Sequence, residues 1–106
     1  MPVKQPAQPQ TADLDLVGVL GALADPTRLA LVARLADQGS QKCSEINDDV
    51  DVHKSTMSHH YRVLREAGVT ATTIHGRQRW IDLRRADLDA CFPGLIDSIL
   101  RAAPRA

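Results

Sequence analysis

Residues 54–68, KSTMSHHYRVLREAG, decide the fold of this 106-residue chain because they predict a helix with two unlike faces. Positions at helical spacing gather large side chains that can pack into a core: Met57, His60, Tyr61 and Leu64. The opposite face gathers small polar or basic side chains: Ser55, Ser58, His59 and Arg62. Gly68 supplies the stop that ends the helix. We therefore expect one face to be buried and the other to meet a polar partner.

Three helices are predicted before this one. Residues 16–24 carry apolar side chains at helical spacing, and Asp25-Pro26 is a helix start signal because the aspartate accepts free amide hydrogen bonds. A second helix follows and stops near Gly39. We expect an apolar stripe of this second helix to face the core: Leu29, Val32, Leu35 and Ala36. A short third helix opens at residues 44–46 and ends in the acidic turn that follows.

The sequence after the long helix switches to a period of two and then returns to helix. The runs 69–74 and 79–83 are β-prone and flank His75-Gly76-Arg77-Gln78, which predicts a hairpin with a basic tip. Residues 86–102 return to a helical pattern that breaks at Pro93-Gly94. This last stretch has more apolar residues than one small core needs.

A short helix, a tight turn, a longer helix and a basic hairpin follow one another in the order of a winged helix-turn-helix, which is mainly α with a small β-hairpin. The chain is neutral overall, but residues 53–85 hold seven basic and two acidic residues and all four histidines. This window of net charge +5 suits the phosphates of duplex DNA. We expect these recognition-helix residues at the DNA: Lys54, Ser55, Thr56, Ser58, His59 and Arg62. In the hairpin, or wing, we expect Arg77 and Arg79 to reach the backbone or a minor groove.

A chain this short hides only about two-thirds of its unfolded surface, so a second copy is expected to cover an apolar face left over. We expect a homodimer formed by the first and last helices, with these residues at the interface: Leu16, Leu20, Leu95 and Ile99. Residues 1–12 are rich in Pro and Gln and show no apolar period, which predicts a disordered arm. Residues 13–106 are expected to form one DNA-binding and dimerisation domain.

Composition argues against several other classes of protein. Only 3% of the residues are aromatic, so no platform exists for stacking a run of unpaired RNA bases. The two cysteines lie 48 positions apart and suggest neither a disulfide framework nor a thiolate zinc cluster, which fits a reducing cytoplasm. No secretion signal, membrane span, Gly-rich phosphate loop or serine with a motif-defined base is found. We therefore expect a cytoplasmic protein at the nucleoid that is not an enzyme and has no cofactor.

Two segments, LADPTRL at 23–29 and STMSHHYRVLREAGV at 55–69, resemble the ArsR/SmtB family of small bacterial regulators. A weaker match extends from about residue 13 to residue 100. The resemblance implies a homodimeric winged helix with terminal helices at the interface. It also places Lys54, Ser55, Ser58, His59 and Arg62 in the recognition helix and has His60 pack inward. The expected function is a transcriptional regulator that represses by binding an inverted-repeat operator in double-stranded DNA as a dimer.

The metal sites known in that family are not expected here. The positions of its Cys-x-Cys pair fall on Lys42 and Ser44, with Cys43 out of register between them. No histidine follows His75, so imidazole ligation on the last helix is excluded. Three possible ligands remain there, too few and too scattered for a transition-metal site: Asp87, Asp89 and Cys91. We expect helix-cap or surface roles for these carboxylates.

Alternative functions stay open at this point. A winged helix that binds an acidic protein would use the same outward face, although protein interfaces favour aromatic or apolar anchors over small polar residues. A redox- or metal-responsive member of the same family is the other alternative. Lys42 could favour the thiolate of Cys43, whereas burial as a small hydrophobe is the simpler interpretation. Asp51-Val52-His53 has the sequence pattern of half a metal site, but roles in the turn and in capping the next helix explain these residues better. The effector, and activation instead of repression, stay open.

Overall fold

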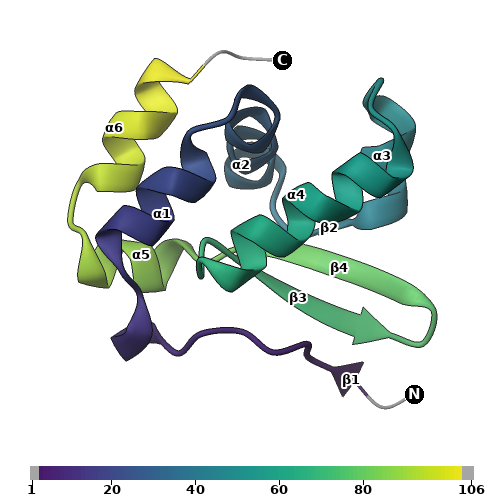
Figure 1. Ribbon diagram of the computed structural model, residues 1–106, viewed down its shortest axis with the longest axis horizontal. Helices are drawn as coiled ribbons and strands as arrows, with labels where there is room; N and C mark the ends of the chain where they lie inside the picture. Colours follow the sequence, from purple (N-terminus) through teal and green to yellow (C-terminus); the bar gives the residue numbers. More distant parts are fainter. Residues whose placement is uncertain (1–2, 104–106) are drawn as a thin grey trace.

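The computed structural model describes residues 3–103, and helices lie over one side of an antiparallel sheet (Figure 1). The helices are α1 (Leu16–Leu23), α2 (Pro26–Gln38), α3 (Cys43–Asp49), α4 (Lys54–Glu66), α5 (Arg85–Cys91) and α6 (Leu95–Ala102), after a 3-10 turn η1 (Thr11–Asp13). The strands are β1 (Val3–Lys4), β2 (Gln41–Lys42), β3 (Thr70–His75) and β4 (Gln78–Leu83). They lie in the order β1-β3-β4-β2. This order of elements confirms the winged helix-turn-helix predicted from the sequence.

The core forms where α1, α2 and α4 meet the hairpin, and α5 and α6 close it. Its fully buried side chains come from these elements, from α3 and from the turn after α4: Val19, Val32, Leu35, Ile46, Met57, Leu64, Val69, Ile81, Leu88 and Ile96. The stripe expected for α2 is partly wrong, because Leu31 is buried while Ala36 is exposed. Leu29 is only half-buried because it faces a groove beside α1 and α6. The core side of α2 is therefore rotated from the predicted one.

Local signals in the sequence explain where the helices begin. Asp15 accepts a hydrogen bond from the Gly18 amide (2.9 Å) at the start of α1. Asp25 accepts one from the Arg28 amide (3.0 Å) at the start of α2, and this bond holds the pKa of the Asp25 carboxyl below its usual value. The start signal predicted at Asp25-Pro26 is thus confirmed.

Residues 3–12 differ from the disordered arm expected for residues 1–12, whose first two residues lie outside the described part of the chain. Val3 and Lys4 pair with Ile74 and His75 of β3. Gln8 Oε1 then accepts a hydrogen bond from the Thr72 amide (2.6 Å). The physical reason is that the free edge of β3 offers backbone hydrogen bonds, which the composition of the arm cannot reveal.

The second half of the same segment is tied to α5. Arg84 Nη1 donates a hydrogen bond to the Pro9 carbonyl (2.7 Å), and Thr11 Oγ1 donates one to Asp87 Oδ1 (2.9 Å). Residues 3–11 therefore run from the wing to the base of α5 (Figure 1).

No single helix among residues 3–103 is long and apolar enough to span a membrane, and α1 with α2 reaches that length only together, across a 100° bend.

Gly68 lies at a crowded turn after α4. Its φ is +82°, in the left-handed region that favours glycine. A Cβ atom there would collide with Leu14 Cδ2 and lie 3.1 Å from Pro9 Cγ. The end of α4 thus depends on glycine for its backbone conformation and for the space taken up by the preceding segment.

We predict that Gly68→Ala lowers the free energy of unfolding by about 2–5 kcal/mol, the combined cost of left-handed strain and overpacking. Gly94→Ala is the matched control, because Gly94 has a φ of +81° but open space around the added carbon. In Gly94→Ala the free energy of unfolding should fall only by the cost of left-handed strain, about 1–2 kcal/mol. Urea unfolding at one fixed protein concentration measures both variants. Equal losses would show that residues 9–14 do not pack over Gly68.

Candidate nucleic-acid interface

The two faces predicted for α4 are confirmed by its burial. Met57, Tyr61 and Leu64 are at most 8% exposed, and His60 is equally buried. The residues predicted to contact DNA are all exposed on the opposite side, which Glu66 shares at the end of the helix: Lys54, Ser55, Thr56, Ser58, His59 and Arg62. The outward face contains no aromatic or large apolar side chain. It therefore presents hydroxyl, imidazole and guanidinium groups on a single helical surface.

Polar contacts fix the inward face of α4 at two points. Tyr61 Oη donates a 2.5 Å hydrogen bond to Asn47 Oδ1 of α3, and burial raises the pKa of the Tyr61 hydroxyl. At the other point Arg28 Nη1 donates to His60 Nδ1 (3.1 Å). The inward packing expected for His60 is confirmed. These contacts set which side of α4 faces solvent.

The start of α4 is organised by His53, the residue before its first turn. His53 Nδ1 accepts a hydrogen bond from the Ser55 amide (3.2 Å) and lies 2.8 Å from Ser55 Oγ. This is the cap chemistry predicted for the 51–53 turn. It leaves Lys54 and Thr56 exposed at the amino end of the helix, where the helix dipole favours anions.

The outward face is also ordered by bonds within α4. Ser58 Oγ donates to the Lys54 carbonyl (3.2 Å), and Arg62 Nη2 donates to His59 Nδ1 (3.2 Å). Arg62 Nε lies 3.8 Å from Glu66 Oε1, and both side chains remain more than half exposed. A surface pair of this kind is weak and can be exchanged for a stronger partner.

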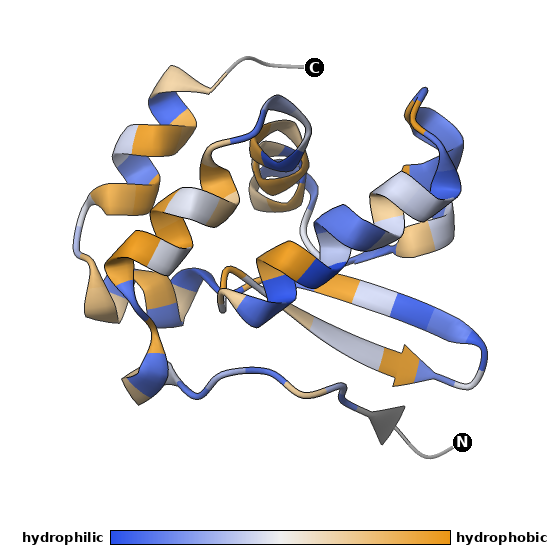
Figure 2. Cartoon of the chain, viewed as in Figure 1, coloured by the Kyte–Doolittle hydropathy of each residue, from blue (hydrophilic) through white to orange (hydrophobic). Residues whose placement is uncertain are grey.

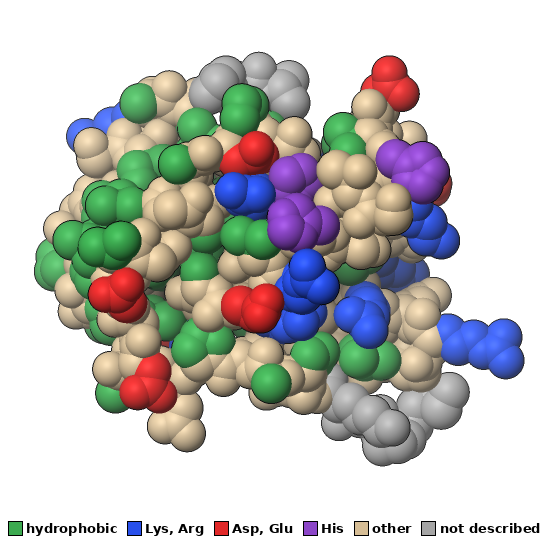
Figure 3. All heavy atoms as spheres, in the orientation of Figure 1, with side chains coloured by type: hydrophobic (Ala, Val, Ile, Leu, Met, Phe, Trp, Pro, Cys, Tyr) green, Lys and Arg blue, Asp and Glu red, His purple; other side chains and the backbone are tan. Residues whose placement is uncertain are grey.

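The wing extends beside α4 as a regular hairpin. Ile74 pairs with Arg79 and His75 with Gln78, and Gly76 turns the chain with a φ of +64°. Arg77 is exposed in this turn. Lys, Arg and His side chains gather over α4 and the hairpin on the face shown in Figure 3. The predicted DNA residues therefore lie on two neighbouring elements.

Arg79 differs from Arg77 in its surroundings. It is exposed, yet it also lines a hollow of about 410 Å³ between α3, α4 and the hairpin. The other lining residues are Cys43, Asn47, Lys54, Ser58, Tyr61, Arg65, Thr72 and Ile81. The hollow was not predicted, although four α4 residues that line it share a helical spacing visible in the sequence: Lys54, Ser58, Tyr61 and Arg65.

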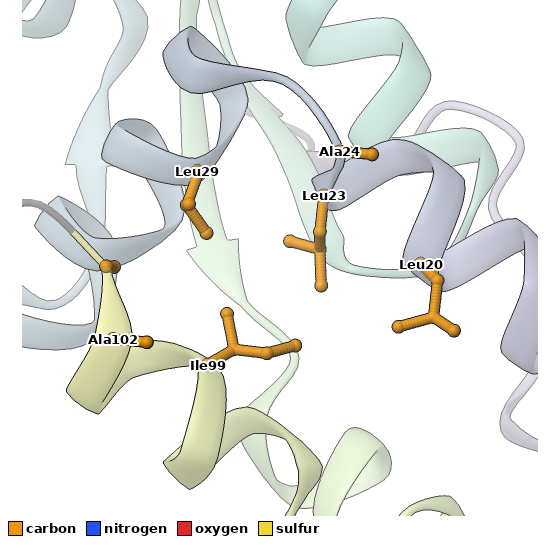
Figure 4. Close-up of a pocket in the computed structure, with 7 residues that line it drawn as sticks. Leu20, Leu23, Ala24, Leu29, Ile99 and Ala102 are labelled. Atoms are coloured by element: carbon orange, nitrogen blue, oxygen red, sulfur yellow. The ribbon is translucent and has the colours of Figure 1, made fainter.

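The residues predicted for dimerisation form a separate apolar surface. Leu16 and Leu20 are 44% and 42% exposed, and Val17 between them is 76% exposed. Leu95 and Ile99 are half-buried. Leu20 and Ile99 border an apolar groove of about 320 Å³ between α1, α2 and α6 (Figure 4). Hydropathic colouring shows the same concentration of apolar residues on α1 and α6, away from the hairpin tip (Figure 2).

The candidate metal ligands are engaged in other contacts. Among residues 3–103, no three His, Cys, Asp or Glu side chains come together in a group that could hold a metal ion. Hydrogen bonds from Thr11 and Arg84 (3.0 Å) lower the pKa of the Asp87 carboxyl. Asp89 accepts from Arg85 (3.1 Å), and Cys91 Sγ donates to the Thr11 carbonyl (3.5 Å). These contacts agree with the helix-end and surface roles expected for the carboxylates.

Cys43 is half-buried in the wall of the hollow. Burial raises the pKa of its thiol from 9.0 to about 11, although the positive charge of Arg79 opposes this rise. Lys42 does not activate the thiol, because its Nζ lies 5.3 Å from the centre of the Trp80 ring in a cation–π contact. The alternative of a redox-sensing Cys43 thiolate is therefore not supported.

Comparison with known proteins gives consistent matches. A family model described as "Helix-turn-helix domain" matches residues 23–73. The uncharacterized HTH-type transcriptional regulator YceK of Bacillus subtilis is 32% identical over 91 residues, which are 85% of this chain and 91% of YceK. The HTH-type transcriptional repressor SmtB of Mycobacterium tuberculosis is 39% identical over 75 residues, 69% of this chain and 54% of SmtB. A crystal structure of an ArsR family transcriptional regulator, RHA00566, aligns with a TM-score of 0.67 and 29% identity, covering 85% of this chain and 98% of that one.

We predict that the thiol of Cys43 reacts slowly with iodoacetamide near neutral pH. With a pKa of about 11, the thiolate fraction at pH 8 falls about 100-fold below that of a cysteine at 9.0, because only the deprotonated form attacks. In Cys91→Ser, where Cys43 is the remaining cysteine, the rate should keep rising until about pH 11. Mass spectrometry of quenched samples follows the reaction. A plateau at or below pH 9 would contradict the burial argument.

Proposed function

The chain belongs to the ArsR/SmtB family of winged helix-turn-helix transcriptional regulators, and on this premise we propose that it is a homodimeric repressor of an inverted-repeat DNA operator. The observation that carries the proposal is the exposed polar face of α4 opposite a buried apolar one.

The outward face of α4 fits the major groove of duplex DNA. A helix with its side chains is about 10–12 Å wide and the groove about 12 Å, so bulky apolar groups would prevent entry. Ser58, His59 and Arg62 offer hydrogen-bonding groups along that face and are assigned to base edges. The first turn of α4 is assigned to the phosphates at the edge of the groove, through Lys54, Ser55 and Thr56.

The wing has a different role in this proposal. Arg77 is exposed in the hairpin turn and Arg79 on the strand that follows, so both can approach the backbone or an adjacent minor groove. Arginine in these places reads phosphate position or groove width, and it carries little base information. The wing therefore contributes affinity, while α4 contributes specificity.

The apolar surface on α1 and α6 supports dimerisation. Three adjacent large side chains of α1 are 42–76% exposed: Leu16, Val17 and Leu20. A carbon added at Gly21 of the same helix would meet nothing within 4 Å, so another helix can approach closely there. Leu95 and Ile99 are assigned to the same interface from α6. A twofold dimer would place two α4 helices about 34 Å apart, one turn of DNA, and would match an inverted repeat.

Repression by blocking a promoter is the simplest mode of action for such a dimer. The name of the similar SmtB includes "transcriptional repressor". The proposed place of action is the cytoplasm, where the DNA is. An interaction module for an acidic protein is disfavoured, because the outward face of α4 lacks the aromatic or apolar anchors typical of binding hot spots.

We predict that Arg62→Ala and the double variant Ser58→Ala/His59→Ala weaken operator binding about 5- to 150-fold, the loss of 1–3 kcal/mol for base contacts. Their binding to random duplex should change much less. Arg77→Ala should weaken both because its contact is to the backbone or groove shape. Fluorescence anisotropy measures each Kd on an operator selected from a random duplex library.

Arg101→Ala is the control for loss of one charge, because Arg101 is exposed on α6. It should leave both affinities unchanged. Equal losses on operator and random DNA for the α4 variants would contradict the division of roles. Failure of the selection to enrich any sequence would contradict specific DNA binding.

We predict that Leu16→Glu/Leu20→Glu converts a dimer into a monomer, because two carboxylates would have to be buried in the interface. Light scattering at micromolar concentration should give twice the chain mass for the natural protein and once the chain mass for this variant. Ala36→Glu, at an exposed position of α2, should stay dimeric. A natural protein that is monomeric would exclude the proposed interface and the half-site spacing with it.

A further inference from the structure

The hollow between α3, α4 and the hairpin concentrates positive charge. Lys54 and Arg65 reach it from α4 and Arg79 from β4, and no carboxylate lines it. Within residues 3–103, none of these three cations forms an ion pair with a described carboxylate. Four arginines outside the hollow do pair with carboxylates: Arg34, Arg62, Arg84 and Arg85. The hollow therefore has a positive charge suited to binding an anion.

Two groups in the wall of the hollow also lack hydrogen-bond partners. Arg65 Nε and Thr72 Oγ1 are both buried, and neither bonds to any described residue. Thr72 is only 2% exposed. Leaving such a group unpaired costs about 1–3 kcal/mol, so a buried unpaired group in a native protein calls for a physical explanation. A ligand seated in the hollow would supply one.

The rest of the wall suits a small organic molecule. Tyr61 and Ile81 contribute ring and aliphatic surface, and Cys43 contributes a thiol. The raised pKa of Cys43 keeps this thiol neutral, so it does not compete for the cations. A volume of about 410 Å³ lies within the range of small-molecule sites.

We propose that this hollow binds a small phosphate monoester and that the bound ester weakens DNA binding. The dianionic phosphate matches three unpaired cations, and guanidinium groups bind phosphate oxygens in pairs. The second half rests on the proposed function, because Lys54, Ser58 and Arg79 line the hollow and are also assigned to DNA. One group cannot serve both partners fully, so each ligand reduces affinity for the other by the same factor.

A phosphate of the DNA duplex is a poorer occupant than a free ester. Lys54, Ser58 and Arg79 are exposed at the rim, where a duplex can reach them. Thr72 and the Nε atom of Arg65 are buried in the wall. A phosphate fixed in a stacked duplex stays outside the rim, whereas a small ester can enter.

Titration calorimetry of the full chain with glycerol 3-phosphate tests the site. We expect one ester per chain and at least tenfold weaker binding by Arg65→Gln, or by Arg65→Lys if the first variant fails to fold. Arg101→Gln should bind as the natural protein does. Glycerol alone should give no heat. Absence of binding at millimolar ester, or equal binding by the Arg65 variants, would overturn the site.

Two threonines provide a sharper control. Thr70 and Thr72 are both buried, and neither hydroxyl bonds to a residue within 3–103, but Thr72 lines the hollow and Thr70 does not. Thr72→Val should weaken ester binding severalfold, whereas Thr70→Val should leave it unchanged. Equal effects of the two substitutions would place the ester elsewhere.

The effect on DNA is measured separately, at constant ionic strength, because added salt alone weakens phosphate contacts. Saturating glycerol 3-phosphate should raise the operator Kd at least tenfold for the natural protein and not for Arg65→Gln. If the operator Kd stays unchanged while the ester occupies its site, the proposal that the ester weakens DNA binding is overturned. Ester binding by a chain that binds no DNA would support the site and overturn the proposed function. DNA binding without ester binding, weakened by Arg65→Gln, would assign Arg65 to a duplex phosphate and overturn the site.

Discussion

The guanidinium of Arg28 joins the three helices on which the rest of the structure depends. Arg28 Nε donates to the Ala22 carbonyl at the end of α1 (2.6 Å), and Nη1 donates to His60 on α4 (3.1 Å). Its own amide is capped by Asp25 at the start of α2. One residue thus sets the relative positions of α1, α2 and α4. Because α1 carries the apolar surface and α4 the polar one, the same contact also relates the two candidate interfaces.

Features encoded by periodicity were predictable from the sequence. The alternation of large and small polar residues along α4 specified its buried and exposed faces, because burial of a helix follows its 3.6-residue repeat. Caps at Asp25 and His53 were predictable for a similar reason, since cap bonds link residues two or three positions apart. The side of α2 that faces the core was misassigned. Leu29 and Leu31 are equally suited to a core by residue type. Which of them is buried depends on the packing of α2, which leaves Leu29 beside the groove that α6 borders.

Features that depend on contacts distant in sequence were not predictable. The segment before α1 is held along β3 by the pairing of Val3 and Lys4 and by the side chain of Gln8, which accepts a hydrogen bond from the Thr72 amide 64 positions away. The hollow beside α4 exists because the hairpin folds back along it and brings Arg79 and Thr72 opposite Arg65. No local pattern places these three residues together. Helical spacing aligns Arg65 with Lys54, Ser58 and Tyr61, but it does not show that residues of the hairpin lie opposite them.

The pairing of β1 and β2 with the hairpin has a consequence for how the protein behaves at high concentration. A wing has to project in order to reach its ligand, and a projecting hairpin normally offers two rows of unpaired backbone groups to any passing strand. Here β1 covers β3 at Ile74 and His75, and β2 covers β4 at Trp80 and Ile81. Each covering strand is two residues long, enough to block strand addition at the last two residues of β3 and the middle two of β4. The chain thereby protects its projecting hairpin from edge-to-edge aggregation with two strands of only two residues each.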